Sequence, residues 1–197
     1  MNMKSSLLYS VFVILCLSAA CTSNETYTPK PRGYFQIKFP KKEYLTYNDG
    51  CPFTFDYPKY TKIEADQERG AGKCWSNVHF TQFNARLHLT YYGVSSQKEY
   101  EGLVEDARTL AFKHTVKANA IDQKLINFPD RKVYGIYYAI EGNTASSVQF
   151  FLTDSAKHYF RGALYFNERP QYDSVAPVVT FIKKDIDRMI DTFRWKN

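Results

Sequence analysis

The chain of 197 residues lacks the short motifs of the common enzyme classes: it has no GxSxG, no HExxH, no P-loop and no CxxC. It also has no internal repeat and no low-complexity tract. Its 26 basic residues exceed its 20 acidic ones only mildly and form no dense run, so binding to nucleic acid is not expected. These absences argue against an enzyme, a cofactor or a small-molecule substrate.

A membrane-spanning helix is also missing, because the one long apolar run, residues 7–20, is shorter than the roughly 20 residues that cross a bilayer. Lys4 precedes this run, and small residues end it at Cys21. A positive start, a short apolar core and a small-residue exit predict an export signal over residues 1–20. The cysteine resembles the lipid-acceptor cysteine of bacterial lipoproteins, although Leu17 lies one position early. The alternative is an ordinary secretory signal cut near Cys21.

Cysteine is scarce, with four in the chain. Cys16 leaves with the signal and Cys21 is the predicted lipid acceptor, so Cys51 and Cys74 remain as an even pair in an exported chain. We expect a disulfide, worth about 3 kcal/mol in the chain-entropy model. Two free thiols, or half of a metal site, are the alternatives.

The first half of the exported chain indicates strands. Residues 21–32 contain two prolines and no apolar periodicity, which predicts a tether, and one domain is expected over residues 33–197. Residues 33–44 are basic and aromatic and could lie as an arm along a sheet edge. Alternation predicts strands at 53–57 and 60–64. Residues 74–82 and 85–92 predict a hairpin in which Val78 lies opposite Leu89 and Phe80 opposite Leu87.

The second half indicates two amphipathic helices around three more strands. Ser96 and Glu99 form a capping box for a helix over 96–118, and a final helix is expected from Asp173 or Ser174 with Pro177 in its first turn. The strands are expected at 133–141, 147–153 and 158–166. Two helices with apolar stripes need a sheet to cover, so we predict an α+β fold with a mainly antiparallel sheet. The element order is similar to that of the PsbP-like fold.

Three groups of polar residues are weak candidates for a metal site or a catalytic site. In the predicted hairpin register His79 faces His88, and two imidazoles can hold a metal, but a stable site needs further ligands and a solvated polar face explains both. Asp154, Ser155 and His158 have the residue types of a hydrolytic triad, although a tight turn explains them more simply. His114 shares the apolar stripe of the first helix, which favours a core position over a catalytic base.

Two serines carry a local signal for modification. Asp154-Ser155-Ala156 and Asp173-Ser174-Val175 resemble the O-glycosylation sequon of the Bacteroidetes. Short motifs arise by chance, and both segments also suit a turn or a helix cap. Ser155 and Ser174 are therefore predicted modification sites only if the chain comes from that phylum.

Several longer stretches resemble the GldD family of gliding motility lipoproteins of the Bacteroidetes. They are Pro29–Phe35, Cys51–Phe55, Cys74-Trp75, Lys113–Thr115, Val148–Asp154, Arg161–Asn167 and Phe193–Lys196. The resemblance spans nearly all of the exported chain. It implies a lipid anchor at Cys21 and partners among the gliding and type IX secretion proteins, and it implies no catalytic residue.

The resulting expectation is a lipid-anchored envelope protein that faces the periplasm and acts as a non-enzymatic component or assembly factor of the gliding and type IX secretion machinery. The alternative is a periplasmic small-ligand-binding module or enzyme with an indirect effect on motility. Residues 32–44 are a candidate segment for docking a partner or facing lipid, or a structural arm. The residues after Cys21 leave both membranes open for the anchor.

Overall fold

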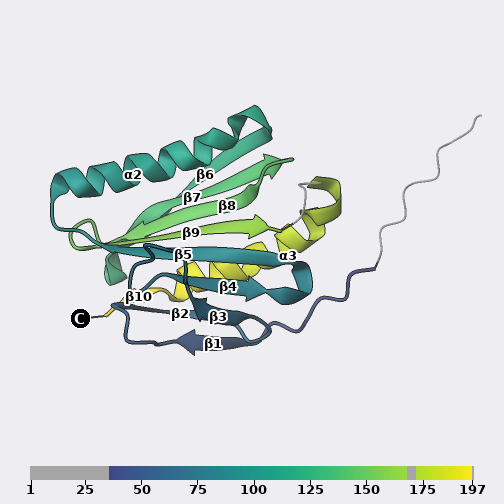
Figure 1. Ribbon diagram of the computed structural model, residues 1–197, viewed down its shortest axis with the longest axis horizontal. Coiled ribbons are helices and arrows are strands. Elements are labelled where there is room, and N and C mark those ends of the chain that lie inside the picture. Colours follow the sequence, from purple (N-terminus) through teal and green to yellow (C-terminus); the bar gives the residue numbers. More distant parts are fainter. Residues whose placement is uncertain (1–35, 168–171, 197) are drawn as a thin grey trace, which may run out of the picture. The chain divides into compact units, whose positions relative to one another are not determined.

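Seven antiparallel strands form the central sheet, in the order β3-β4-β5-β9-β8-β7-β6 (Figure 1). The computed structural model describes residues 36–167 and 172–196, and those from Ile37 onward belong to one unit. The strands are β3 Lys62–Ala65, β4 Ser76–Phe80, β5 Ala85–Gly93, β6 Ala118–Phe128, β7 Val133–Gly142, β8 Ser146–Thr153 and β9 His158–Phe166. The signal, Cys21 and the tether lie outside the described residues and stay predictions.

A second, three-stranded sheet has the order β1-β2-β10. Its strands are β1 Tyr44–Tyr47, β2 Phe53–Pro58 and β10 Arg194–Trp195, and both pairings are antiparallel. β10 pairs with the start of β2, and the backbone N–H of Lys196 donates to the carbonyl oxygen of Pro52 at 2.9 Å. The last described residues therefore complete a sheet that the first strands begin.

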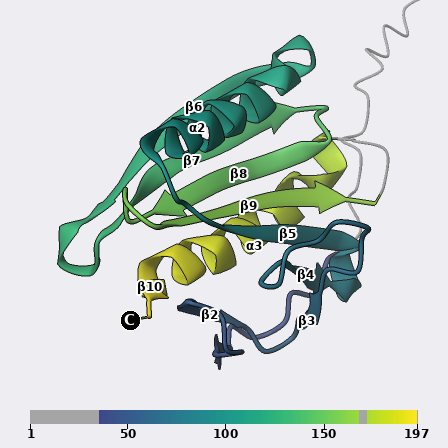
Figure 2. The same cartoon turned by 60° about the vertical axis from the view of Figure 1, so that its left-hand side comes forward.

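Two helices, α2 (Gln97–Phe112) and α3 (Tyr172–Thr192), pack on opposite faces of the large sheet (Figure 2). The Ser96 hydroxyl accepts from the backbone N–H of Glu99, as the capping box predicts. Short 3-10 helices cover Thr81–Phe83, Lys113–Val116 and Pro129–Arg131. The α+β fold expected from the sequence is confirmed.

The α3 face holds the larger core. Phe53 of β2, Phe160 of β9 and Phe193 at the end of α3 are fully buried. The ring of Phe160 lies 4.8 Å from that of Phe53 and 5.0 Å from that of Phe193. Aromatic contacts of this kind hold the small sheet and α3 against the large sheet.

The α2 face has a smaller apolar cluster. Ala107 and Ala111 of α2 pack with Tyr138 of β7, Phe151 of β8 and Tyr159 of β9. Small residues on the helix let it approach the large rings of the sheet closely. Successive residues of β7, β8 and β9 alternate between this cluster and the α3 core, as the pleat requires.

Several local predictions were wrong. β4 and β5 pair with Val78 opposite Leu87 and Phe80 opposite Ala85, two residues from the predicted register. The cause is a longer connection: Thr81–Phe83 forms a 3-10 turn, and Asn84 is left-handed with φ 48°. A shift of two keeps each side chain on its face, so the predicted apolar face was right.

The helix boundaries also differ from prediction. α2 ends at Phe112 and a 3-10 turn follows, so the predicted continuation to Ala118 was wrong. Pro177 lies inside α3, which begins at Tyr172, and not in its first turn. β6, an edge strand of 11 residues, was missed.

Candidate functional site

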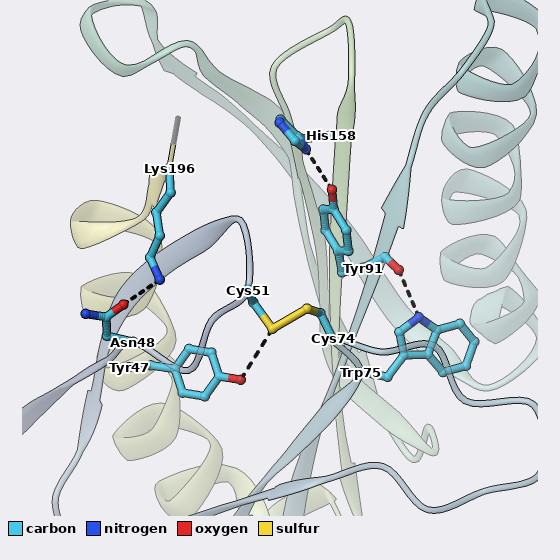
Figure 3. Close-up of a disulfide and its surroundings, with 8 residues drawn as sticks. All are labelled: Tyr47, Asn48, Cys51, Cys74, Trp75, Tyr91, His158 and Lys196. Carbon is cyan, nitrogen blue, oxygen red and sulfur yellow. Dashed lines mark hydrogen bonds between the residues drawn. A yellow bond between two sulfur atoms is a disulfide. The ribbon is translucent and has the colours of Figure 1, made fainter.

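The predicted disulfide between Cys51 and Cys74 is present, with the two Cα atoms 5.8 Å apart. Cys51 lies in the connection between β1 and β2, and Cys74 lies just before β4. The bond therefore joins the small sheet to the large one. Both cysteines are buried, and the Tyr47 hydroxyl lies 3.9 Å from the Cys51 sulfur (Figure 3).

Two cavities of about 300 and 390 Å³ flank the disulfide. Lys73 and Trp75 line both of them. The smaller cavity also has Asn48 and Asp49 in its wall, and the larger has Tyr92. These volumes lie near the lower end of the range of roughly 300–1,000 Å³ that is usual for ligand pockets.

Trp75 is held in one orientation between the cavities. Its indole Nε1 donates to the carbonyl oxygen of Tyr91 at 2.9 Å, and its ring meets that of Tyr92 edge to face at 5.4 Å. A Cβ at Gly72 would lie 2.8 Å from the indole nitrogen, so glycine lets the backbone approach the ring. These contacts restrict the indole ring to one orientation.

Residues that lie far apart in the sequence support this site (Figure 3). The Tyr91 hydroxyl lies 2.7 Å from Nδ1 of His158, whose ring stacks on that of Trp195 at 5.0 Å. Lys196 Nζ donates to Asn48 Oδ1 at 2.5 Å. In the sequence the cysteine pair signalled this site, whereas the aromatic residues around it gave no local signal.

The two predicted weak metal ligands do not face each other. His79 of β4 pairs with Arg86, and His88 of β5 pairs with Asn77, so the predicted His79–His88 pairing is wrong. Nε2 of His79 lies 3.4 Å from a carboxylate oxygen of Glu64. Among residues 36–167 and 172–196, no three His, Cys, Asp or Glu side chains are grouped to hold a metal ion.

The group at 154–158 forms a turn. The Asp154 carboxylate accepts the backbone N–H groups of Ala156, Lys157 and His158 at 2.8–3.0 Å, and these bonds lower its pKa against the opposing effect of burial. Ser155 is exposed with φ 63°. This is the turn that the sequence offers as the simpler explanation.

Ser174 and His114 are the remaining candidate positions, and they differ in burial. Ser174 is exposed on α3, and glycosylation of Ser155 and Ser174 stays a prediction. His114 lies in the 3-10 turn after α2, and burial, followed by the positive charge of Arg161, lowers its pKa.

Asp185 of α3 anchors the arm that precedes β1. Its side chain is 1% exposed and accepts from Lys42 Nζ at 2.5 Å, from the Tyr44 hydroxyl at 2.9 Å and from the Tyr60 hydroxyl. Burial, strengthened by the bond to Asp185, raises the pKa of Tyr44 to about 12. A buried carboxylate needs such donors, so the cluster fastens the arm to α3.

The arm itself contacts α3 and the 3-10 turn that follows β4. Phe39 stacks on Phe181 with ring centres 4.5 Å apart, and Gln82 Nε2 donates to the Lys38 carbonyl oxygen at 2.7 Å. Residues 36–43 form no strand, so the arm does not extend a sheet edge before Tyr44. No helix in the described part of the chain is long and apolar enough to cross a membrane.

Comparisons with known proteins give a family and a likeness to solved structures. A family model described as "Gliding motility lipoprotein GldD" matches residues 24–195. A search of curated proteins finds no match. The solution structure of cyanobacterial PsbP (CyanoP) from Synechocystis sp. PCC 6803 is similar, with a TM-score of 0.45 and 10% identity, covering 82% of this chain and 97% of that chain.

The family match covers nearly all of the chain that follows the predicted signal, including every described strand and helix. Membership in a lipoprotein family implies membrane anchoring in the cell envelope. The chain belongs to the GldD family of gliding motility lipoproteins.

Proposed function

We propose that this protein is a lipid-anchored, periplasm-facing component or assembly factor of the gliding and type IX secretion machinery, and that it catalyses no reaction. The observation that carries the proposal is the family match over residues 24–195. A disulfide that joins two sheets supports it, because such bonds persist in oxidising compartments outside the cytoplasm. Cys21 is the proposed lipid acceptor.

The surface around the disulfide is the first place to look for contact with another component. Trp75 and Tyr92 are aromatic residues of the kind that dominate binding energy in interfaces, and both line a cavity. Trp75 is half-buried and held by a hydrogen bond to Tyr91. A fixed ring beside a cavity suits the capture of an apolar side chain from a partner segment.

Deletion of the gene tests the function. Cells without the protein should fail to spread on agar, and the wild-type gene should restore spreading. A gene that carries Cys21→Ala should not restore spreading, because the domain would lose its membrane anchor. Normal spreading of the deletion strain would reject the proposal.

Crosslinking in living cells tests the contact. A photo-reactive residue at Lys73, beside the disulfide, should capture a partner that mass spectrometry identifies as a gliding or secretion protein. The matched control is Lys98, which is exposed on α2 and should capture nothing specific. Trp75→Ala should reduce capture and spreading together at unchanged protein abundance. Lost spreading with unchanged capture would favour the ligand-binding or enzyme alternative.

A further inference from the structure

One part of the α2 face of the large sheet is polar. By strand register Ala163 of β9 lies between Gln149 of β8 and His88 of β5. Arg161 and Tyr165 lie two positions away on β9 and therefore point to the same face. These four side chains surround a small residue, and we call Gln149, His88, Arg161 and Tyr165 the Ala163 frame. α2 packs on this face beside the frame, where the Tyr159 hydroxyl of β9 donates to the Leu103 carbonyl oxygen of α2 at 3.0 Å.

Gln149 is the most informative member of the frame, because it is 2% exposed yet incompletely bonded. Its Oε1 accepts from Arg161 Nη2 at 2.7 Å. Its Nε2 is buried and has no hydrogen-bond partner. Leaving a buried donor unpaired costs about 1–3 kcal/mol, so this nitrogen calls for an acceptor.

Two further buried atoms on this face are also without a partner: Arg86 Nε and Asn77 Oδ1. Arg86 lies two residues before His88 on β5, and Asn77 lies directly opposite His88 on β4. Gln149 Nε2 and Arg86 Nε are donors and point to a missing acceptor, whereas Asn77 Oδ1 is itself an acceptor and needs a donor. Two of the three atoms are N–H donors, which an oxygen-rich group would satisfy.

The charge of this face is positive. Neither Arg86 nor Arg161 forms an ion pair with a described carboxylate, and Glu64 on the same face pairs with His79 instead. Burial, and then the charge of Arg86, lowers the pKa of His88, while Asp66 and Glu68 oppose this more weakly. An anion placed here would meet two guanidinium groups that no carboxylate in the described part of the chain pairs with.

We propose that the Ala163 frame, together with Arg86, binds a small oxyanion, a phosphate or carboxylate group of a ligand. Gln149 Nε2, Arg86 Nε and the guanidinium group of Arg161 supply the donors. Charge-assisted hydrogen bonds to an oxyanion are the strong ones, and planar guanidinium groups match its geometry. The site is independent of the lipid anchor and of any contact at the disulfide.

The test is a binding titration of the full-length protein in detergent, followed by NMR at the side-chain amide of Gln149 and the backbone amide of Ala163. Sodium phosphate and sodium acetate are titrated separately against sodium chloride at equal ionic strength. One of them should bind saturably. Tighter phosphate binding assigns a phosphoryl ligand, and tighter acetate binding assigns a carboxylate.

Variants distinguish binding at the Ala163 frame from the non-specific attraction of anions to a basic protein. Arg86→Gln and Arg161→Gln should each weaken binding about tenfold or more, since each removes a charge-assisted bond. Gln149→Leu should weaken it without changing the net charge. Lys98→Gln, which removes an exposed charge from α2, should leave the affinity unchanged. Far-UV circular dichroism confirms that every variant folds.

Three results would overturn the proposal. The first is the absence of saturable binding by either anion. The second is equal weakening in Arg161→Gln and Lys98→Gln, which would indicate an adventitious ion only. The third is a crystal structure grown in the tighter-binding anion in which ordered water alone bonds to Gln149 Nε2.

Discussion

The two faces of the seven-stranded sheet are completed in different ways. The α3 face is covered by a long helix and a second sheet, and its core is rich in aromatic rings. The α2 face has apolar residues under the helix and polar ones around Ala163. The difference indicates that the α3 face supplies most of the stability, while the polar part of the α2 face is where we propose that an oxyanion binds.

The largest expected effect is on the α3 face. Phe160→Ala removes a fully buried ring between Phe53 and Phe193 and should lower the free energy of unfolding by about 3–5 kcal/mol. Urea denaturation measures it. The matched control is the next residue, Arg161→Ala, which points to the opposite face and should cost less, about 1–3 kcal/mol, because it leaves the buried Gln149 Oε1 without its donor. Equal losses would contradict the comparison of the two faces.

Removing the disulfide tests how much this link between the two sheets stabilises the α3 face. The double variant Cys51→Ala, Cys74→Ala releases a loop with a sequence separation of 23 and should lose about 3 kcal/mol. Thermal unfolding measures the loss. Reduced wild-type protein should have the same melting temperature as the variant. An unchanged melting temperature in both would contradict the expected stabilisation by the disulfide.

The next effect concerns the Asp185 cluster. Asp185→Ala leaves Lys42, Tyr44 and Tyr60 without their common acceptor and should cost about 2 kcal/mol, since Lys42 keeps some exposure to water. Asp185→Asn keeps one acceptor oxygen and should cost less. Urea denaturation of both variants measures the difference, and the reverse order would argue against a hydrogen-bonded anchor.

Removing the N-cap of α2 should lower the free energy of unfolding by less than the α3-face changes described above. Ser96→Ala removes the hydroxyl that accepts from the Glu99 N–H and should cost about 1 kcal/mol. Urea denaturation at neutral pH measures it, with Lys98→Ala, an exposed position of the same helix, as the control. A loss as large as that of Phe160→Ala would show that α2 carries more of the stability than its small core indicates.

The smallest effect is a dependence on alkaline pH. The pKa of Tyr44 is raised from 10.0 to about 12, so the unfolded chain releases this proton first as the pH rises. The contribution of Tyr44 is intact below pH 10 and is lost as the pH rises toward about 12. Tyr44→Phe should therefore lose less stability across this window than wild type, and parallel profiles would contradict the assignment.

Much of the fold follows from local sequence patterns. β9 has the predicted bounds, and Ser96 caps α2 as its spacing with Glu99 requires. β6 escaped prediction because most of its side chains are exposed on both faces, so no apolar alternation marks it. The register of β4 and β5 was missed because it depends on the turn formed by Thr81–Phe83, which apolar spacing does not reveal.

Less of the candidate sites could be predicted. Cys51 and Cys74 were paired by elimination, but Trp75 meets Tyr91, and His158 meets Trp195, across distances in sequence that no local pattern records. The Ala163 frame needs the order of β5, β9 and β8, since its members lie on three strands. Such sites become visible only once the strand order is known.

The pairing of β10 with β2 also constrains the order in which parts of the fold can form. β2 is made early, whereas β10 leaves the ribosome after every other described element. The disulfide partners are both made by residue 74, well before either helix exists. The cross-link needs an oxidising compartment and so forms after export, and the small sheet is finished only when the last few residues have also been made and exported.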